Sequence, residues 1–554
     1  MRLRSSFLVL AFATVSCTAA VEPDPTPTDE PSADAASVTT TRPGQPLTVV
    51  ADVEPAASAT AMSRAVFERS PVVVAAPADD RAGTLMGASV AVGLGVPLLL
   101  VPRSGEEFAG VATELDRLRV DTVLAVGDTE GTALDADAYD VVSVAARSEA
   151  LAAVTGLDLD SPKTVAQDGD AAAVAALDPD ALVALRPEDA ESDTERGGAE
   201  GELPPVVRAD PLTGTVVLAT GEAESAAALA TARAAGIEVV LTGGTTDPRG
   251  SADAIDALAR SGEQAVIALG AGFAAEAGLD WKAATAATGQ QLPGGGQLLF
   301  PGRLIVALYG HPGTGALGVL GEQPLDAAIE RARAHAAPYE PLVDATVVPA
   351  FEIIATVASS SAGADGNYSA EADPEFLRPW VEAAGEAGLY VVLDLQPGRT
   401  DFVTQAEQYR SLLELPHVGL ALDPEWRLGP NEVHLTQIGS VEVEEVNQVV
   451  TWLADLTRDN ALPQKLLVLH QFRLDMLPGR ERVDTSRDEL AVMIHADGQG
   501  NQGDKQATWR ALHASAPANL AWGWKNFYDE DQPMLTPEQT IAQVDPVPDL
   551  ISYQ

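Results

Sequence analysis

The sequence is poor in cysteine and in lysine, and these two scarcities exclude several classes of protein. Its 554 residues include one cysteine, Cys17, which excludes a disulfide framework and a cysteine-based zinc site. Basic residues number 34, mostly arginine, against 81 acidic residues, so the formal net charge is −47. Such a surface repels phosphates, which argues against nucleic acid and anionic membrane surfaces as partners. The acidity is typical of a well-solvated surface, and the preference for arginine is typical of a GC-rich, actinobacterial-like genome.

Apolar runs long enough to span a membrane are also missing, and the most apolar run lies near the start of the sequence. Residues 7–15 (FLVLAFATV) are too few to span a bilayer as a helix. With the basic residues before them and the small Ser16 before Cys17, they resemble a bacterial lipoprotein signal over residues 1–17. The resemblance implies that Cys17 carries a lipid and that only this anchor touches the membrane. Simple secretion is the alternative; both predict export, to the outer face of the cytoplasmic membrane or to the cell wall.

Residues 18–46 have no apolar period at all. They are rich in proline, threonine, alanine and acidic residues. Such a composition buries too little apolar surface to fold, so it predicts a disordered linker between an anchor and a folded body.

Residues 47–285 alternate between strand-like and helix-like patterns. Short runs rich in valine and leucine at 71–77, 96–102 and 121–128 are separated by alanine-rich segments of helical spacing. The same order recurs over 214–272. Strand, helix and strand in succession imply a parallel sheet with right-handed crossovers. The pattern therefore predicts a Rossmann-like parallel α/β region built from a repeated unit.

Parts of this region resemble the cell wall binding repeat 2 family of Gram-positive surface proteins. The similar stretches are GASVAVGLGVPLLLVP (87–102) and VDTVLAVGD (120–128), with weaker similarity in ATARAAGIEVVLTGG (230–244) and EQAVIALGAG (263–272). The resemblance implies non-covalent attachment to cell-wall polymer. We find no catalytic set of residues in this region.

Residues 298–554 contain eight apolar runs with helical segments between them. The count and the length are those of a (β/α)8, TIM-like barrel. The eight runs are 304–312, 345–357, 389–398, 418–426, 465–472, 490–498, 519–527 and 549–554.

Polar and aromatic residues gather at the C-terminal ends of these runs, where barrels of this kind keep their active sites. Side chains two apart on a strand point the same way, so Asp423 and Glu425 are expected to face the barrel mouth together. The residues at these ends that we expect to form a site are Tyr309, His311, Glu352, Asp394, Gln396, Asp423, Glu425, Trp426, His470, His495, Asp497, Trp524 and Lys525.

Paired carboxylates beside aromatic rings point to glycoside hydrolysis. That reaction needs two carboxyl groups roughly 5–10 Å apart, one of them a proton donor. The stretch LALDPEW (420–426) looks like the Asp-x-Glu strand ends of several glycosidase families, lysozyme-like ones included. On this interpretation Glu425 is the general acid, with its pKa raised by apolar neighbours. Asp423 or Asp394 is the second carboxylate, and the remaining strand-end residues bind a cell-wall polymer or another glycan without a cofactor or metal.

The residues alone leave two other functions open. The barrel could bind glycan without cleaving it, as part of a cell-surface protein. It could instead be a metal-dependent hydrolase, with His311, His470, His495 and Asp497 as ligands from three strands.

Overall fold

The computed structural model describes residues 35–554 apart from 104, 130–131, 133, 135–137, 190–201 and 261–264. The predicted signal peptide, Cys17 and residues 18–34 of the predicted linker lie outside this part of the chain. Among the helices that the structure does describe, none is long and apolar enough to span a bilayer.

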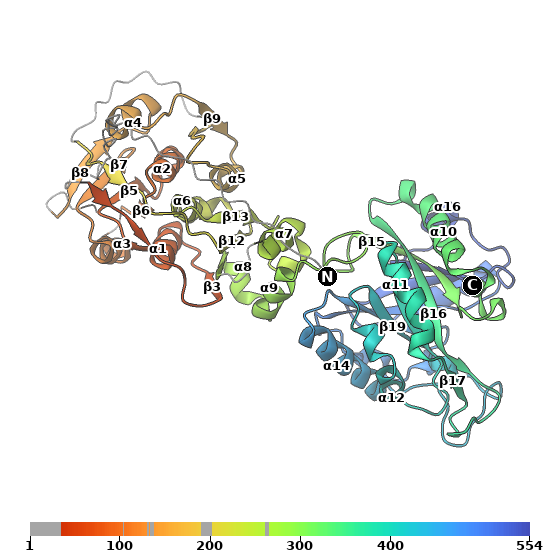
Figure 1. The fold of residues 1–554 in the computed structure, drawn as a ribbon. Helices are drawn as coiled ribbons and strands as arrows, with labels where there is room; N and C mark the ends of the chain where they lie inside the picture. Colours follow the sequence, from red (N-terminus) through yellow and green to blue (C-terminus); the bar gives the residue numbers. More distant parts are fainter. Residues whose placement is uncertain are drawn as a thin grey trace, which may run out of the picture.

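The N-terminal half contains two four-stranded parallel sheets (Figure 1). In the first sheet the strand order is β6-β5-β7-β8, and in the second it is β13-β12-β14-β3. In each sheet three successive strands share one order, with the second beside the first and the third on the other side, which confirms the predicted parallel α/β repeat. The fourth strand differs, because β8 follows β7 in the chain whereas β3 precedes the other strands of its sheet. The strands are β5 (Val72–Pro77), β6 (Leu98–Val101), β7 (Thr122–Val126), β8 (Asp140–Val144), β12 (Thr215–Ala219), β13 (Glu238–Leu241), β14 (Ala265–Leu269) and β3 (Leu47–Val50).

Alanine-rich helices join these sheets into one core. Helix α6 (Ala226–Ala234) packs against α1 (Pro55–Val66) and α2 (Arg81–Leu94), and its small side chains allow the close approach. Buried residues of both sheets belong to the same apolar cluster. The other helices are α3 (Gly105–Leu118), α4 (Ser148–Thr155), α5 (Asp170–Ala175), α7 (Ala252–Arg260), α8 (Ala271–Ala275) and α9 (Leu279–Ala287), and a small parallel sheet pairs β9 (Pro162–Val165) with β10 (Ala184–Pro187).

The end of the predicted linker differs from expectation. Strand β1 (Ala36–Ser37) pairs with β11 (Val206–Val207), and β2 (Thr39–Thr40) pairs with β4 (Phe67–Arg69). Residues 36–40 are therefore ordered by backbone partners further along the chain. Their composition alone could not reveal these partners, because strand pairing satisfies backbone groups whatever the local hydrophobicity.

The C-terminal half is a closed barrel of eight parallel strands, as predicted (Figure 1). Each strand pairs with the next along the chain, and the last pairs with the first. A short strand, β17 (Ser369–Glu371), adds antiparallel to β16 outside the barrel. The barrel strands are β15 (Arg303–Gly310), β16 (Thr346–Ala358), β18 (Tyr390–Leu395), β19 (Val418–Leu422), β20 (Lys465–Gln471), β21 (Leu490–Ala496), β22 (Ala521–Asn526) and β23 (Leu550–Tyr553).

Helices cover the outside of the barrel with one exception. Between β20 and β21 the chain forms two 3₁₀ turns, Leu474–Met476 and Arg480–Arg482, in place of an α-helix. The covering helices are α10 (Leu325–Ala336), α11 (Pro374–Glu386), α12 (Phe402–Glu407), α13 (Arg410–Leu413), α14 (Val443–Asp459), α15 (Gln502–His513) and α16 (Pro537–Gln543).

Inside the barrel, apolar and polar side chains form separate layers. Alternate residues of each strand face the interior. At the N-terminal end these residues are apolar and form one cluster, which includes Ala350, Val392, Ala421 and Val468. Two positions further along the chain come Glu352, Asp394 and His470 on their strands, and Asp423 directly after the end of its strand. The polar layer therefore rests on a packed apolar layer that excludes water from below.

The two halves meet at α9. Lys282 is 1% exposed, and its Nζ lies 2.6 Å from Asp488 Oδ2 in the barrel half. The ring of Trp281 lies beneath two guanidinium groups, with the Cζ of Arg249 at 4.5 Å and that of Arg458 at 4.8 Å from its centroid. One salt bridge, from Lys282 to Asp488, and one cation–π contact, from Arg458 to Trp281, thus join the halves.

A substitution at Gly419 can test the close packing inside the barrel. A Cβ atom at this position would lie 2.7 Å from the backbone oxygen of Leu466 and 2.9 Å from the hydroxyl of Tyr390. That hydroxyl accepts a hydrogen bond from Leu466 N. We expect Gly419→Ala to lower the free energy of unfolding by about 1–3 kcal/mol in urea denaturation, because overpacking forces the strands apart.

A matched control is Gly110→Ala in α3, where a Cβ atom would meet nothing within 4 Å. This substitution should raise stability by about 0.5–1 kcal/mol, since alanine favours the helix. Equal stability of Gly419→Ala and wild type would contradict the packing described.

Candidate active site

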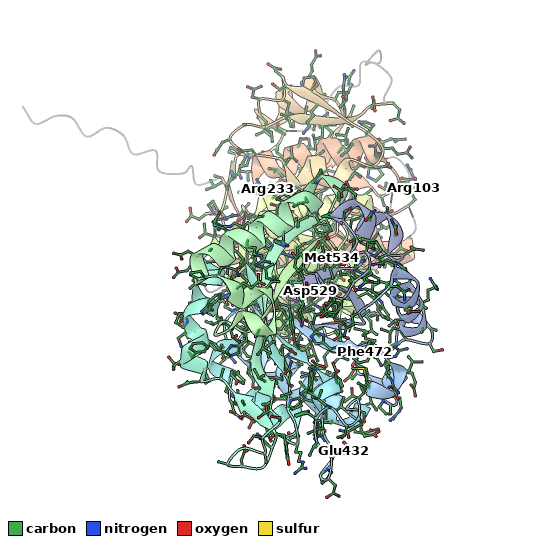
Figure 2. The ribbon with its side chains drawn as sticks, turned by 90° about the vertical axis from the view of Figure 1, so that its right-hand side faces the viewer. Arg103, Arg233, Glu432, Phe472, Asp529 and Met534 are labelled. Carbon is green, nitrogen blue, oxygen red and sulfur yellow. The ribbon has the colours of Figure 1, made fainter. Side chains whose placement is uncertain are left out.

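A cavity of about 380 Å³ opens at the C-terminal ends of the barrel strands. Seven of the residues expected from the sequence line it: Tyr309, Gln396, Asp423, Glu425, Trp426, Asp497 and Lys525. Phe472 (labelled in Figure 2), Phe527 and Gln554 are further lining residues that the sequence analysis did not single out. Both phenylalanines follow directly after barrel strands, so their position was the signal that could have identified them.

Asp423 and Glu425 reach the cavity through a turn. Strand β19 ends at Leu422, and Asp423 begins the 3₁₀ turn Pro424–Trp426. The Oδ1 atom of Asp423 accepts a hydrogen bond from Glu425 N at 3.2 Å. The two residues line the same cavity, as expected. The reason differs from the expected one: no strand continues through them, and Asp423 instead caps the turn that carries Glu425.

The carboxyl group of Glu425 is a proton donor near neutral pH. Burial, and then the nearby charge of Asp497, raises the pKa of Glu425 to about 7. The pKa of Asp423 lies well above its usual range, chiefly through burial and then through the charge of Asp394. The cavity wall therefore combines carboxyl groups of raised pKa with the side chain of Lys525, whose Nζ lies 3.4 Å from the centroid of the Tyr309 ring.

Asp394 lies below the cavity wall and is fully buried. Its Oδ2 atom accepts a hydrogen bond of 2.9 Å from the hydroxyl of Tyr309. Gln396 Nε2 lies 3.5 Å from the same hydroxyl. Burial raises the pKa of Asp394 to about 6, although the charge of His470 opposes this shift.

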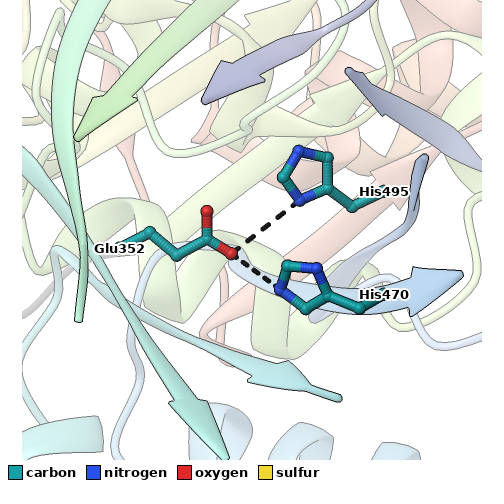
Figure 3. Close-up of side chains that lie close together, drawn as sticks. All are labelled: Glu352, His470 and His495. Carbon is teal, nitrogen blue, oxygen red and sulfur yellow. Dashed lines mark ion pairs between the residues drawn. The ribbon is translucent and has the colours of Figure 1, made fainter. Parts of the chain in front are cut away.

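A buried ionic cluster centres on His470, beneath the cavity. Its Nε2 atom lies 2.8 Å from Glu352 Oε1 and 3.8 Å from Asp394 Oδ1, and its Nδ1 atom lies 3.1 Å from Asp497 Oδ2 (Figure 3 shows the Glu352 contact). Burial lowers the pKa of His470, but the surrounding carboxylates outweigh it and hold the value well above the usual range. Burial likewise opposes ionisation of Glu352, yet the charges of His470 and His495 bring its pKa to about 2.

His495 completes this cluster from β21. Its Nδ1 atom lies 3.8 Å from Glu352 Oε1 (Figure 3), and its Nε2 atom lies 3.1 Å from the hydroxyl of Ser552. Burial lowers the pKa of His495 to about 4, so this imidazole is neutral at pH 7. Ser552 was not anticipated, although it faces inward on β23 two positions after Leu550.

Two residues expected in the site lie elsewhere. His311 stacks on Phe376, with ring centroids 5.9 Å apart, and its Nδ1 atom accepts a hydrogen bond from Gly313 N. Trp524 belongs to an apolar cluster with Trp509 outside the barrel. Successive residues of a strand face opposite sides, and Lys525 is the one that faces the interior of the barrel. Trp524 therefore points away from the cavity.

A second cavity, of about 420 Å³, adjoins the first. Glu425 and Trp426 line both cavities. Leu435, which is 87% exposed, lines the second cavity together with His434 and Arg473. Glu425, whose pKa is raised to about 7, therefore lies where the two cavities meet.

No protein-family model and no curated protein matches the chain. Among solved structures, Cwp8 from Clostridium difficile is similar at 12% identity and a TM-score of 0.31, over 45% of this chain and 53% of that chain. Cwp6 from Clostridium difficile is similar at 11% identity and a TM-score of 0.29, over 64% of this chain and 66% of that chain. The match thus spans about half the length of Cwp8, and scores this low carry no argument about fold or function. The resemblance to the cell wall binding repeat 2 family stays a prediction from sequence.

The raised pKa of Glu425 predicts a specific pH dependence of stability. The folded protein keeps a proton on Glu425 up to about pH 7, whereas an ordinary glutamate releases it near 4.5. As pH rises through this window the unfolded chain loses the proton first, so this group lowers the stability of the fold. Between pH 4.5 and 7.5, the free energy of unfolding of Glu425→Gln should fall by about 1–3 kcal/mol less than that of wild type. Urea denaturation at the two pH values measures this difference.

The exposed residue Glu386 supplies the control. Glu386→Gln also removes one carboxyl group and should keep the wild-type pH dependence. An identical pH dependence in wild type and Glu425→Gln would show that Glu425 does not titrate as described.

Proposed function

We propose that the barrel hydrolyses glycan, with Glu425 as the general acid, in an exported protein of the cell envelope. The observation that carries this proposal is the pKa of about 7 for a carboxyl group that lines an open cavity beside Trp426. A general acid must hold a proton at the working pH and release it easily, and a value near neutrality meets both needs.

Asp497 is the second carboxyl group in this proposal. It lines the same cavity, and its negative charge is the second-largest cause of the raised pKa of Glu425. Its Oδ2 atom is held by His470, while its Oδ1 atom has no hydrogen-bond partner among the described residues. That oxygen is buried under the cavity wall, so Asp497 would act as a base or a nucleophile only after the side chain turns this oxygen towards the cavity.

Asp423 and Asp394 take supporting roles. The capping hydrogen bond to Glu425 N occupies one oxygen of Asp423 and fixes the turn that carries the acid. Asp394 is fully buried and does not line the cavity. We therefore assign Asp423 to positioning and place Asp394 outside the reacting pair.

The shape of the site favours a polymer as substrate. A chain that ran through both cavities would pass Glu425 at their junction, where a bond within the chain would be cleaved. Trp426 lines both sides of that junction and offers an aromatic face to a sugar ring. Together with the predicted wall-binding region, this favours cell-wall polymer or another glycan of the surroundings.

Substitution of the carboxyl groups tests the assignment. Glu425→Gln and Asp497→Asn should each lower the hydrolysis of peptidoglycan or another polysaccharide by about 100-fold or more. Asp423→Asn should lower it less, because asparagine can also cap the turn. Glu386→Gln, which removes a carboxyl group far from the cavity, should leave hydrolysis unchanged.

Release of reducing ends from a panel of polysaccharides measures this activity. Wild-type protein that binds these polymers without cleaving them would replace the proposal with the function of a glycan-binding surface protein. Equal hydrolysis by wild type and Glu425→Gln would exclude Glu425 as the acid.

We further propose that Cys17 carries the lipid anchor, on the strength of the signal-like residues 1–17. The full chain, produced in a bacterium that processes lipoproteins, should incorporate labelled palmitate, and Cys17→Ser should not. Secretion of an unlabelled wild-type protein into the medium would instead support simple cleavage.

A further inference from the structure

We propose that Glu352, His470 and His495 bind one divalent transition-metal ion of the zinc type beneath the cavity. Glu352 Oε1 on β16 faces His470 Nε2 and His495 Nδ1, which come from the neighbouring strands β20 and β21 across the barrel interior (Figure 3). One ligand atom from each residue lies within 4.8 Å of the other two. Two imidazole nitrogens and a carboxylate oxygen are a typical donor set for zinc.

The converging atoms have no other hydrogen-bond partners. Among the described residues, both carboxylate oxygens of Glu352, His470 Nε2 and His495 Nδ1 are buried and make no hydrogen bond of good geometry. All three side chains are at most 1% exposed. Buried polar atoms without partners are costly and rare, so several of them aimed at one point indicate a missing group.

The far side of each imidazole ring is held by a polar partner. Asp497 Oδ2 accepts from Nδ1 of His470 at 3.1 Å, so when the ion displaces the second ring proton it is Nε2 that offers a lone pair. Ser552 Oγ lies 3.1 Å from Nε2 of His495, which likewise leaves Nδ1 facing Glu352. Histidines that bind metals almost always donate their other ring N–H to such a partner, because this fixes the tautomer and the ring orientation.

Asp394 lies beside these ligands, although it is outside the group of three whose ligand atoms all lie within 4.8 Å of one another. Its Oδ1 atom lies 3.8 Å from His470 Nε2, is buried and has no hydrogen-bond partner among the described residues. Ligands of a tetrahedral zinc ion lie roughly 3.3 Å apart, so the contact of His470 with Glu352 must widen slightly when the ion binds. The three ligands are at most 1% exposed and lie beneath the cavity, so we assign the ion a structural role.

This site differs from the metal set considered in the sequence analysis. His311 lies outside it, and Asp497 supports His470 from behind instead of binding the ion. The inference does not rest on glycan hydrolysis. An imidazolium at His470 is the alternative way to balance the same carboxylates, and a measurement of metal content separates the two.

Metal analysis of the full chain is the experiment. After equilibration with zinc chloride and removal of unbound ion, wild-type protein should retain about one zinc per chain by mass spectrometry. Glu352→Gln and His495→Gln should each lose it. Glu386→Gln and His513→Gln, which change the same residue types outside the cluster, should retain it.

A second measurement covers variants that fold poorly. Chelation with EDTA should lower the melting temperature of wild type, and zinc should restore it. Cobalt in place of zinc should produce visible absorption bands in wild type that are absent in His495→Gln. The proposal is overturned if wild type retains neither zinc nor cobalt, or if both cluster variants retain as much zinc as wild type.

Discussion

Barrel closure is the constraint on which the rest of this structure depends. Eight parallel strands, joined from β15 round to β23, force every second side chain of each strand into a single interior. Residues far apart in sequence, such as Glu352 and His495, are thereby brought to the same height. Below them, small and apolar side chains fill the interior and keep water out. The candidate site is thus the upper surface of a packed core.

Charge balance then governs what this layer can do. Glu352, Asp394, Asp423 and Asp497 share one interior with His470 and Lys525, and they cannot all be ionised without compensation. Near the basic groups, Glu352 is ionised. Towards the cavity, Glu425 retains its proton up to about pH 7. A proton donor at the cavity and a charged cluster beneath it are therefore two results of the same uneven distribution.

The barrel and the repeated parallel sheets could be predicted because strand length, apolar runs and their order are local properties of the sequence. Which side of a strand faces inward could also be inferred, since alternation places Asp394 and His470 on the interior side. The sequence could not distinguish Lys525 from Trp524, because both follow β22's apolar run and only the register with neighbouring strands decides which points inward. Nor could it show that Asp423 caps a turn, or that His311 turns away towards Phe376.

The position of β3 has a mechanical consequence. This strand, Leu47–Val50, follows the N-terminal segment yet forms the outer strand of the second sheet, paired in parallel with β14. A force applied through the N-terminus would first load the short pairings of β1 with β11 and of β2 with β4, and only after these had parted would it load the hydrogen bonds between β3 and β14. The barrel lies beyond α9 and would carry little of this load, so the cavity would keep its shape under such a force.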